Sequence, residues 1–119
     1  MLQVFGIPNC DTVKKARRFL DDRNVTYQFN DFKKTPPTLE QLKSWNSQVG
    51  EELVNKRGRT FRQIKENYEI LGSAERLELL QNQTSAIKRP IIESQGKILA
   101  LGFDESKLSK VLLEKPSAS

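Results

Sequence analysis

The chain has 119 residues, which is enough for one domain with its own hydrophobic core. It contains a single cysteine, Cys10, and no histidine, which excludes an internal disulfide, histidine acid/base catalysis and histidine metal ligation; no metal site, zinc included, is expected. The glycine-rich phosphate-binding loops of P-loop and dinucleotide-binding proteins are also absent from the sequence.

The charge balance is basic, with 20 Lys and Arg residues against 15 Asp and Glu residues and a net charge of +5. The cations cluster at residues 14–18, 56–62 and 88–89. Such an excess suits an anionic small substrate, an acidic partner or a nucleic acid, although a solvated surface is the simpler interpretation of 14–18. No signal peptide or apolar run of membrane-spanning length is visible in the sequence. We therefore expect the protein to work in the reducing cytoplasm and to have no membrane partner.

The first two predicted elements are a strand and a helix that meet at Cys10. Apolar residues alternate over residues 2–5, and Gly6 and Pro8 break the strand. Asn9 is a good N-cap, which would make Cys10 the first helical residue. The apolar positions that follow recur at helical spacing and form one inward face: Val13, Ala16, Phe19 and Leu20.

The placement of Cys10 predicts a reactive thiol. A helix N-terminus offers unsatisfied N–H groups and the positive end of the helix dipole, and both favour the thiolate. Lys14 and Arg17 follow one and two turns later and should lower the thiol pKa further, whereas Asp11 should raise it. The alternative is that Cys10 is a small, inert core residue, as many free cysteines are.

The next segments complete a βαβ unit and begin a helical region. Residues 25–30 alternate as a second strand, so the intervening helix predicts a parallel, right-handed crossover. A break at 33–37 precedes a helix capped by Thr38, with Gln41 at the capping-box position and three residues facing inward: Leu39, Leu42 and Trp45. A polar, mainly helical stretch then continues to about residue 83.

The last part of the chain predicts two strands and a helix. Residues 91–93 and 97–101 are strand-like, and a hairpin turn at 94–96 joins them. Asp104 would cap a final helix whose inward residues are Leu108, Val111 and Leu112. Residues 116–119 would form a flexible tail.

The order of elements is therefore βαβ, a helical insertion at about residues 36–84, and then ββα. This order predicts the α/β thioredoxin-like fold, with a helical insertion subdomain, in a single domain spanning residues 1–115. Ligands of such sheets bind at the carboxyl ends of the parallel strands, and Cys10 lies at that end.

Four segments of the sequence form a recognisable set of motifs. They are residues 6–17 (GIPNCDTVKKAR), 55–61 (NKRGRTF), 87–92 (IKRPII) and 101–103 (LGF). Together they resemble the active-site segment and three further blocks of the ArsC/Spx family, and within it the YffB-like proteins. The resemblance implies that Cys10 is the nucleophile.

Further site residues follow from the same resemblance. Arg89 would bind the anionic substrate or glutathione, and Pro90 would be the cis-proline that faces the cysteine in thioredoxin-like folds. Arg57 would be a second anion-binding arginine, with Arg59 and Arg62 as open alternatives for that role. The candidates for substrate or glutathione binding beside the cysteine are Asn9 and Lys14.

Departures from the family pattern bear on the reaction. Gly6 stands where arsenate reductases of the family usually carry a histidine, residues 11–13 replace their Gly-Thr-Ser, and their further arginine near Phe103 is absent. Val13 stands where Spx regulators usually have the second cysteine of C-x-x-C, which excludes a disulfide switch of that type.

The resulting prediction is a thiol oxidoreductase without a bound cofactor. The Cys10 thiolate would attack a disulfide or another oxidised small substrate, and glutathione, or a glutaredoxin charged by it, would resolve the adduct because the chain has no second cysteine. The alternatives are an arsenate reductase proper and a Spx-like regulator that binds RNA polymerase, which is a less favoured partner. Direct nucleic-acid binding is not expected.

Overall fold

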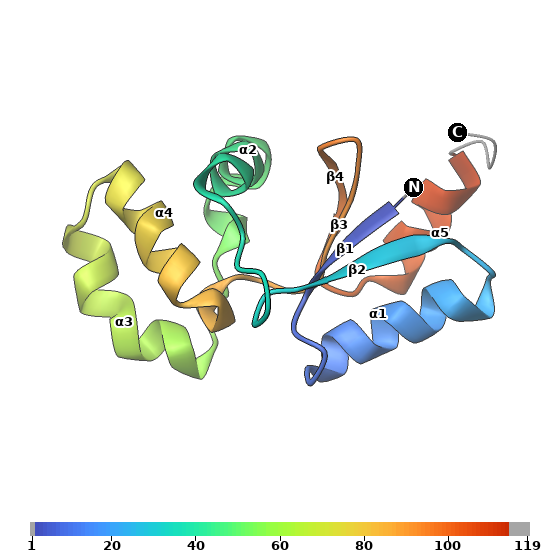
Figure 1. Ribbon diagram of the computed structural model, residues 1–119, viewed down its shortest axis with the longest axis horizontal. Coiled ribbons are helices and arrows are strands. Elements are labelled where there is room, and N and C mark those ends of the chain that lie inside the picture. The colour runs from blue at the N-terminus through green and yellow to red at the C-terminus, as the bar shows by residue number, and fades with distance from the viewer. Residues whose placement is uncertain (1, 115–119) are drawn as a thin grey trace. The chain divides into compact units, whose positions relative to one another are not determined.

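The computed structural model describes residues 2–114, and these fall into two compact units. One unit contains residues 2–31 and 89–114, and the other contains Phe32–Lys88 (Figure 1). The helical insertion expected at about 36–84 lies within the second unit, whereas the predicted tail at 116–119 lies outside the described residues. No helix within the described part of the chain is both long and apolar enough to cross a membrane.

The first unit is a four-stranded sheet with two helices, in the thioredoxin-like order that the sequence predicts. The strand order is β2-β1-β3-β4; β1 pairs in parallel with β2 and antiparallel with β3, and β3 pairs antiparallel with β4. The elements in chain order are β1 (Leu2–Gly6), α1 (Asp11–Asp22), β2 (Tyr27–Asp31), β3 (Ile91–Ser94), β4 (Lys97–Leu101) and α5 (Glu105–Glu114).

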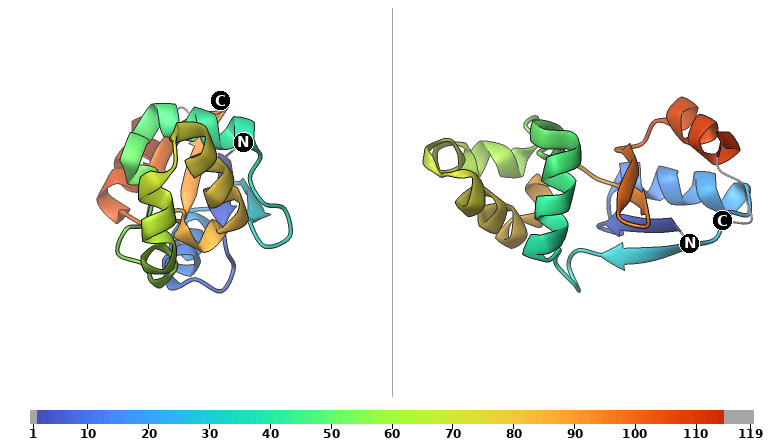
Figure 2. Two further views of the ribbon diagram at one scale, coloured as in Figure 1. Left: turned by 90° about the vertical axis from the view of Figure 1, so that its left-hand side faces the viewer. Right: turned by 90° about the horizontal axis from the view of Figure 1, so that it is seen from above.

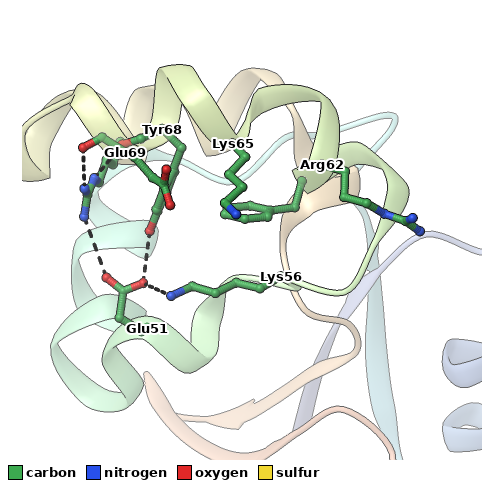
Figure 3. Close-up of a pocket in the computed structure, with 8 residues that line it drawn as sticks. Glu51, Lys56, Arg62, Lys65, Tyr68 and Glu69 are labelled. Carbon is green, nitrogen blue, oxygen red and sulfur yellow. Dashed lines mark hydrogen bonds and ion pairs between the residues drawn. The ribbon is translucent and has the colours of Figure 1, made fainter.

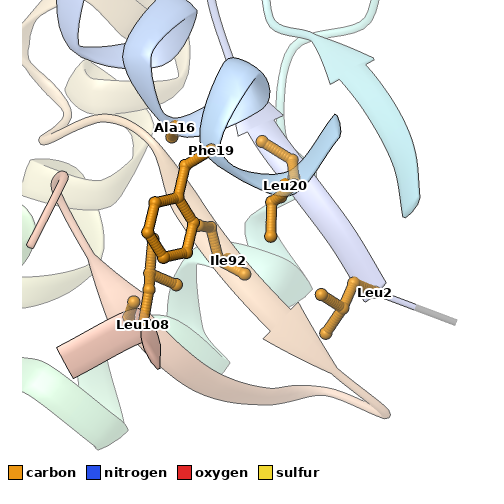
Figure 4. Close-up of a cluster of buried hydrophobic side chains, with 8 residues drawn as sticks. Leu2, Ala16, Phe19, Leu20, Ile92 and Leu108 are labelled. Carbon is orange, nitrogen blue, oxygen red and sulfur yellow. The ribbon is translucent and has the colours of Figure 1, made fainter. Parts of the chain in front are cut away.

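Both helices of this unit pack on the same face of the sheet. One cluster of buried side chains joins α1 and α5 to alternate positions of β1, β3 and β4 (Figure 4): Leu2, Val4, Ala16, Phe19, Leu20, Ile92, Ala100 and Leu108. This packing buries the apolar face predicted for the first helix and fixes that helix against β1. The strand and helix that flank Cys10 therefore belong to one rigid core.

Several boundaries in this unit differ from the predicted ones. β1 includes Gly6, which was expected to break it, and β2 ends at Asp31 rather than at residue 30. The second strand begins at Tyr27 rather than Val25, because the Val25 N–H donates to the carbonyl oxygen of Leu20 (3.0 Å) and so belongs to the turn after α1. The hairpin turn consists of Gln95 and Gly96, with φ angles of 54° and 81°, and Ser94 extends β3 by one residue. Positive φ at both positions is typical of the two-residue hairpin turn.

The last helix begins as predicted. The side chain of Asp104 accepts a hydrogen bond from the backbone N–H of Lys107 (3.0 Å), which is the expected N-cap interaction. Leu108 is buried, while Val111 and Leu112 are only half-buried.

The second unit is helical (Figures 1 and 2). Thr38 and Gln41 form the predicted capping box: the Thr38 nitrogen lies 2.9 Å from Gln41 Oε1, and the Gln41 nitrogen lies 3.0 Å from Thr38 Oγ1. Of the residues predicted to face inward, Leu42 and Trp45 are buried and Leu39 is half-buried. The elements are α2 (Leu39–Val49), a 3₁₀ turn (Gly50–Leu53), α3 (Arg59–Ile70), α4 (Ser73–Asn82) and a second 3₁₀ turn (Thr84–Ala86).

Candidate active site

Cys10 occupies the N-cap position of α1, directly after the turn that follows β1. Its φ and ψ angles of −126° and 126° are those of extended backbone, and its carbonyl oxygen accepts the first helical hydrogen bond, from the N–H of Lys14 (2.9 Å). The prediction that Asn9 caps the helix is therefore wrong by one residue. Asn9 lies exposed in the turn at residues 8–9, so the chain has not yet reached the helix at that point.

The junction between β1 and α1 is tightly packed. Val13 is fully buried, and a Cβ atom added at Gly6 would lie only 2.8 Å from its Cγ2 atom. Only glycine leaves room for this approach of helix to strand. Because Val13 is the third helical residue, its contact with Gly6 also fixes the first turn of α1, where the Cys10 side chain lies.

The thiol pKa of Cys10 lies below its ordinary value, as predicted. Partial burial is the largest single influence and raises the pKa, but several groups act together in the other direction. These are the backbone N–H of Val13, a hydrogen bond from the Arg89 side chain, the Arg89 charge and the backbone N–H of Thr12. The Cys10 side chain makes no cap hydrogen bond of conventional geometry with either N–H group. The partial positive charge of both N–H groups still favours the thiolate.

Arg89 and Pro90 lie at the start of the segment that returns to the sheet in the same unit as Cys10. The Arg89–Pro90 peptide bond is cis, which confirms that prediction. Pro90 is buried, and its carbonyl oxygen accepts a hydrogen bond from the N–H of Gly102 (2.8 Å). Arg89 is half-buried and hydrogen-bonds the Cys10 sulfur, so a guanidinium and a thiolate meet at one half-exposed point.

The structure places the other three cations that were predicted to act at the site in different surroundings. Arg17 was expected to act on the thiol, but its guanidinium stacks over the Phe29 ring (4.1 Å) and donates to the Tyr27 hydroxyl (3.3 Å), so β2 holds it. Lys14 is exposed one turn after Cys10, and its binding role stays a prediction. Arg57 is exposed in a turn of the second unit, and its binding role also stays a prediction.

The sequence predicted that N–H groups at the start of the helix favour the thiolate, but not which N–H groups these are. The N–H groups of Thr12 and Val13 act on the sulfur because Cys10 is the N-cap, and these are the second and third residues of the helix. Moving the cap from Asn9 to Cys10 would have identified them. The Gly6–Val13 contact is harder to predict from the sequence. The only indication is a glycine at the end of a strand, followed by an apolar residue in the first turn of the next helix.

Comparisons with known proteins found a family match and several related sequences. The ArsC family model matches residues 5–111 of the chain. The chain is 39% identical over 109 residues to an uncharacterised protein of Haemophilus influenzae, a match that spans 90% of this chain and 95% of that protein. It is also 24% identical to the global transcriptional regulator Spx of Listeria innocua, over 94% of this chain and 87% of the regulator.

Two solved structures are similar as well. The YFFB (PA3664) protein has 36% sequence identity and a TM-score of 0.86, and the match covers 94% of this chain and 99% of that one. A protein described as a possible arsenate reductase from Streptococcus mutans has 30% identity and a TM-score of 0.75, covering 87% of this chain and 91% of that one.

Proposed function

The chain belongs to the ArsC family, and on that premise we propose that it is a thiol reductase whose nucleophile is Cys10 and whose resolving thiol is glutathione. The observation that carries the proposal is a single, half-exposed cysteine whose pKa is lowered by helix N–H groups and one arginine. A thiolate in that setting attacks oxidised sulfur, and the chain offers no second thiol to resolve the product.

The proposed substrate is a mixed disulfide between a substrate thiol and glutathione. The Cys10 thiolate attacks the glutathionyl sulfur; a new S–S bond forms as the old one breaks, and the substrate leaves as a thiolate that takes a proton from water. A second glutathione thiolate then attacks the glutathionyl sulfur on Cys10. This step releases glutathione disulfide and regenerates the Cys10 thiolate, so the two electrons come from glutathione.

Arg89 has two roles in this proposal. In the free protein it hydrogen-bonds the thiolate and lowers its pKa. With substrate bound, its planar fork is suited to a carboxylate of glutathione, in a geometry that a lysine cannot reproduce. Asn9 and Lys14 are exposed beside the thiol, where they would contact the rest of the same ligand.

Two similar proteins suggest alternative functions. A solved neighbour is described as a possible arsenate reductase, and a curated relative is the regulator Spx. A glutathione-linked reductase is favoured over a Spx-like regulator because Val13 stands where a C-x-x-C disulfide would need its second cysteine. It is favoured over arsenate reduction because Gly6 and Val13 are packed where a histidine side chain at position 6 would have to fit.

The test is turnover of glutathione with a small mixed disulfide, measured for the wild type and for Cys10→Ser with glutathione reductase and NADPH as the coupled readout. We expect saturable turnover by the wild type and only the uncatalysed rate with Cys10→Ser. Mass spectrometry should detect Cys10 carrying one glutathionyl group when the mixed disulfide is added without glutathione. Equal rates for the two proteins would refute the proposal.

A further inference from the structure

The helical unit contains a charged pocket whose lining includes neither Cys10 nor Arg89. Its volume is about 470 Å³, and its lining comes from the segment around Gly50–Lys56, from α3 and from α4 (Figure 3): Glu51, Lys56, Phe61, Arg62, Lys65, Tyr68, Glu69 and Arg76. Pockets that hold small ligands have volumes of roughly 300–1,000 Å³. The size therefore matches a small molecule.

One end of the pocket is organised around the carboxylate of Glu51. Its oxygens lie 2.9 Å from Lys56 Nζ and 3.8 Å from a terminal nitrogen of Arg76, and one accepts a hydrogen bond from the Tyr68 hydroxyl (3.4 Å). Arg76 also donates to the backbone carbonyl oxygens of Tyr68 (2.8 Å) and Glu69 (3.1 Å). Glu51 therefore neutralises part of the charge here and holds two cations in place without a ligand.

The other end of the pocket carries cations that no carboxylate balances. Arg62 and Lys65 lie one turn apart on α3, both are exposed, and neither has an ion pair or side-chain hydrogen bond within residues 2–114. Figure 3 shows Arg62 extending away from Glu51, with Lys65 between it and Tyr68. Four cations and two carboxylates line the pocket, so its lining carries a net positive charge.

The floor of the pocket is apolar and fixed. The rings of Phe61 and Tyr68 pack edge to face, with centroids 5.3 Å apart, and only 4% and 6% of these residues is exposed. The backbone that positions Arg62 and Lys65 is therefore anchored by buried neighbours on the same helix. A fixed floor lowers the entropic penalty of gathering several cations around one ligand.

From this arrangement we propose that the pocket binds a small multivalent anion, of the organic di- or triphosphate class, independently of Cys10. Arginine forms bidentate hydrogen bonds with phosphate oxygens, and lysines supply point charges that suit the same groups. Arg62 and Lys65 would supply the first contacts to such an anion, since both line the pocket and neither is paired with a carboxylate in the described part of the chain; Lys56, which is paired with Glu51, lines the same pocket. An acidic peptide is less suited, because these cations line a single pocket and do not follow a long groove.

The experiment titrates inorganic pyrophosphate into the full-length protein at constant ionic strength and follows backbone amide resonances by NMR. We expect saturable shifts confined to residues 50–76. The double variant Arg62→Ala/Lys65→Ala should bind at least about tenfold more weakly, the effect of losing one charge-assisted hydrogen bond. The same titration with Cys10→Ser should match the wild type.

A matched control separates a site from general surface charge. Lys15 and Arg18 are also an exposed lysine and arginine one turn apart, on α1, so Lys15→Ala/Arg18→Ala removes the same charge at the same spacing. It should change the affinity by less than about twofold, because screened charges outside the pocket contribute little. Equal losses in the two double variants, or shifts that do not saturate, would overturn the proposal. Tighter binding of a glutamate-rich peptide than of pyrophosphate would also overturn it, in favour of a peptide site.

Discussion

The Cys10 site and the Glu51 pocket stabilise a negative charge by different means. At Cys10 the charge sits on one half-buried sulfur, and backbone N–H groups together with a single arginine lower its pKa. At Glu51 the carboxylate is largely exposed, and two cationic side chains and a tyrosine hydroxyl surround it. Its pKa is lowered as well, mainly by the hydrogen bond from Lys56.

The difference separates preorganised chemistry from adaptable binding. Backbone N–H groups in a helix cannot rotate away, so the Cys10 environment persists when a substrate arrives. Lys56 and the Glu51 carboxylate are exposed side chains, and an ion pair between such side chains contributes little energy and can rearrange around a ligand. Single substitutions should therefore have large effects at Cys10 and small effects at Glu51.

The largest expected effect is at Arg89. Arg89→Ala removes the hydrogen bond and the charge that favour the thiolate, so the Cys10 pKa should rise. Glutathione binding should weaken by about 1.5–3 kcal/mol, the contribution of a charge-assisted hydrogen bond. Arg89→Lys should restore the pKa better than the affinity, because lysine keeps the charge but lacks the planar fork. Alkylation rate against pH and an NMR titration with glutathione measure the two quantities.

Arg17→Ala is the matched control for this prediction. Arg17 is also on the chain segment next to Cys10, but Phe29 and Tyr27 hold its guanidinium. Its removal should leave the pH profile of alkylation unchanged. If Arg17→Ala raises the Cys10 pKa as much as Arg89→Ala does, the assignment of Arg89 as the controlling cation is wrong.

The next effect in size concerns the junction of β1 and α1. In Gly6→Ala the new methyl group would lie 2.8 Å from Val13 Cγ2, and a β-branched side chain in a helix has little rotamer freedom to move away. We expect a loss of about 1–3 kcal/mol in the free energy of unfolding, as for other overpacked cores. The Cys10 pKa should also rise, because displacement of Val13 moves the N–H that favours the thiolate. Urea unfolding and alkylation rate against pH measure these effects.

A double-mutant cycle with Val13→Ala tests the cause. If the steric contact is responsible, Gly6→Ala should destabilise the Val13→Ala protein much less than the wild type. Additive losses would show that position 6 affects stability in another way.

Comparison of the two sites also shows what local sequence can predict. A lone cysteine between a strand and an amphipathic helix drew attention to Cys10, and the resemblance of residues 87–92 to a family motif drew attention to Arg89 and Pro90. The capping box at Thr38 and the cap at Asp104 were predictable for the same reason, since each depends on residues three positions apart. The fold class followed from the order of such elements.

Features that depend on tertiary position were missed or misplaced. Arg17 was assigned to the thiol because helical spacing cannot reveal that β2 brings Phe29 beneath it. The cap was placed at Asn9 because its side chain is the better cap, whereas the conformation of the turn decides the position. The Glu51 pocket has no local signature, since its residues are spread from 51 to 76 over three elements.

The smallest expected effect is at Glu51, and its pH dependence tests the comparison most directly. Glu51→Gln should lower the free energy of unfolding by no more than about 1 kcal/mol, because the carboxylate and its nearest cation, Lys56, are exposed and solvent screens their ion pair. The folded pKa of Glu51 lies below its ordinary value of 4.5, so its stabilising effect is complete above that value and is lost as the pH falls through the folded pKa. Urea unfolding of the wild type and Glu51→Gln should therefore differ at pH 7 and converge in acid. A difference of several kcal/mol at pH 7 would mean that the pocket is as rigidly built as the thiol site, and the contrast between the two would fail.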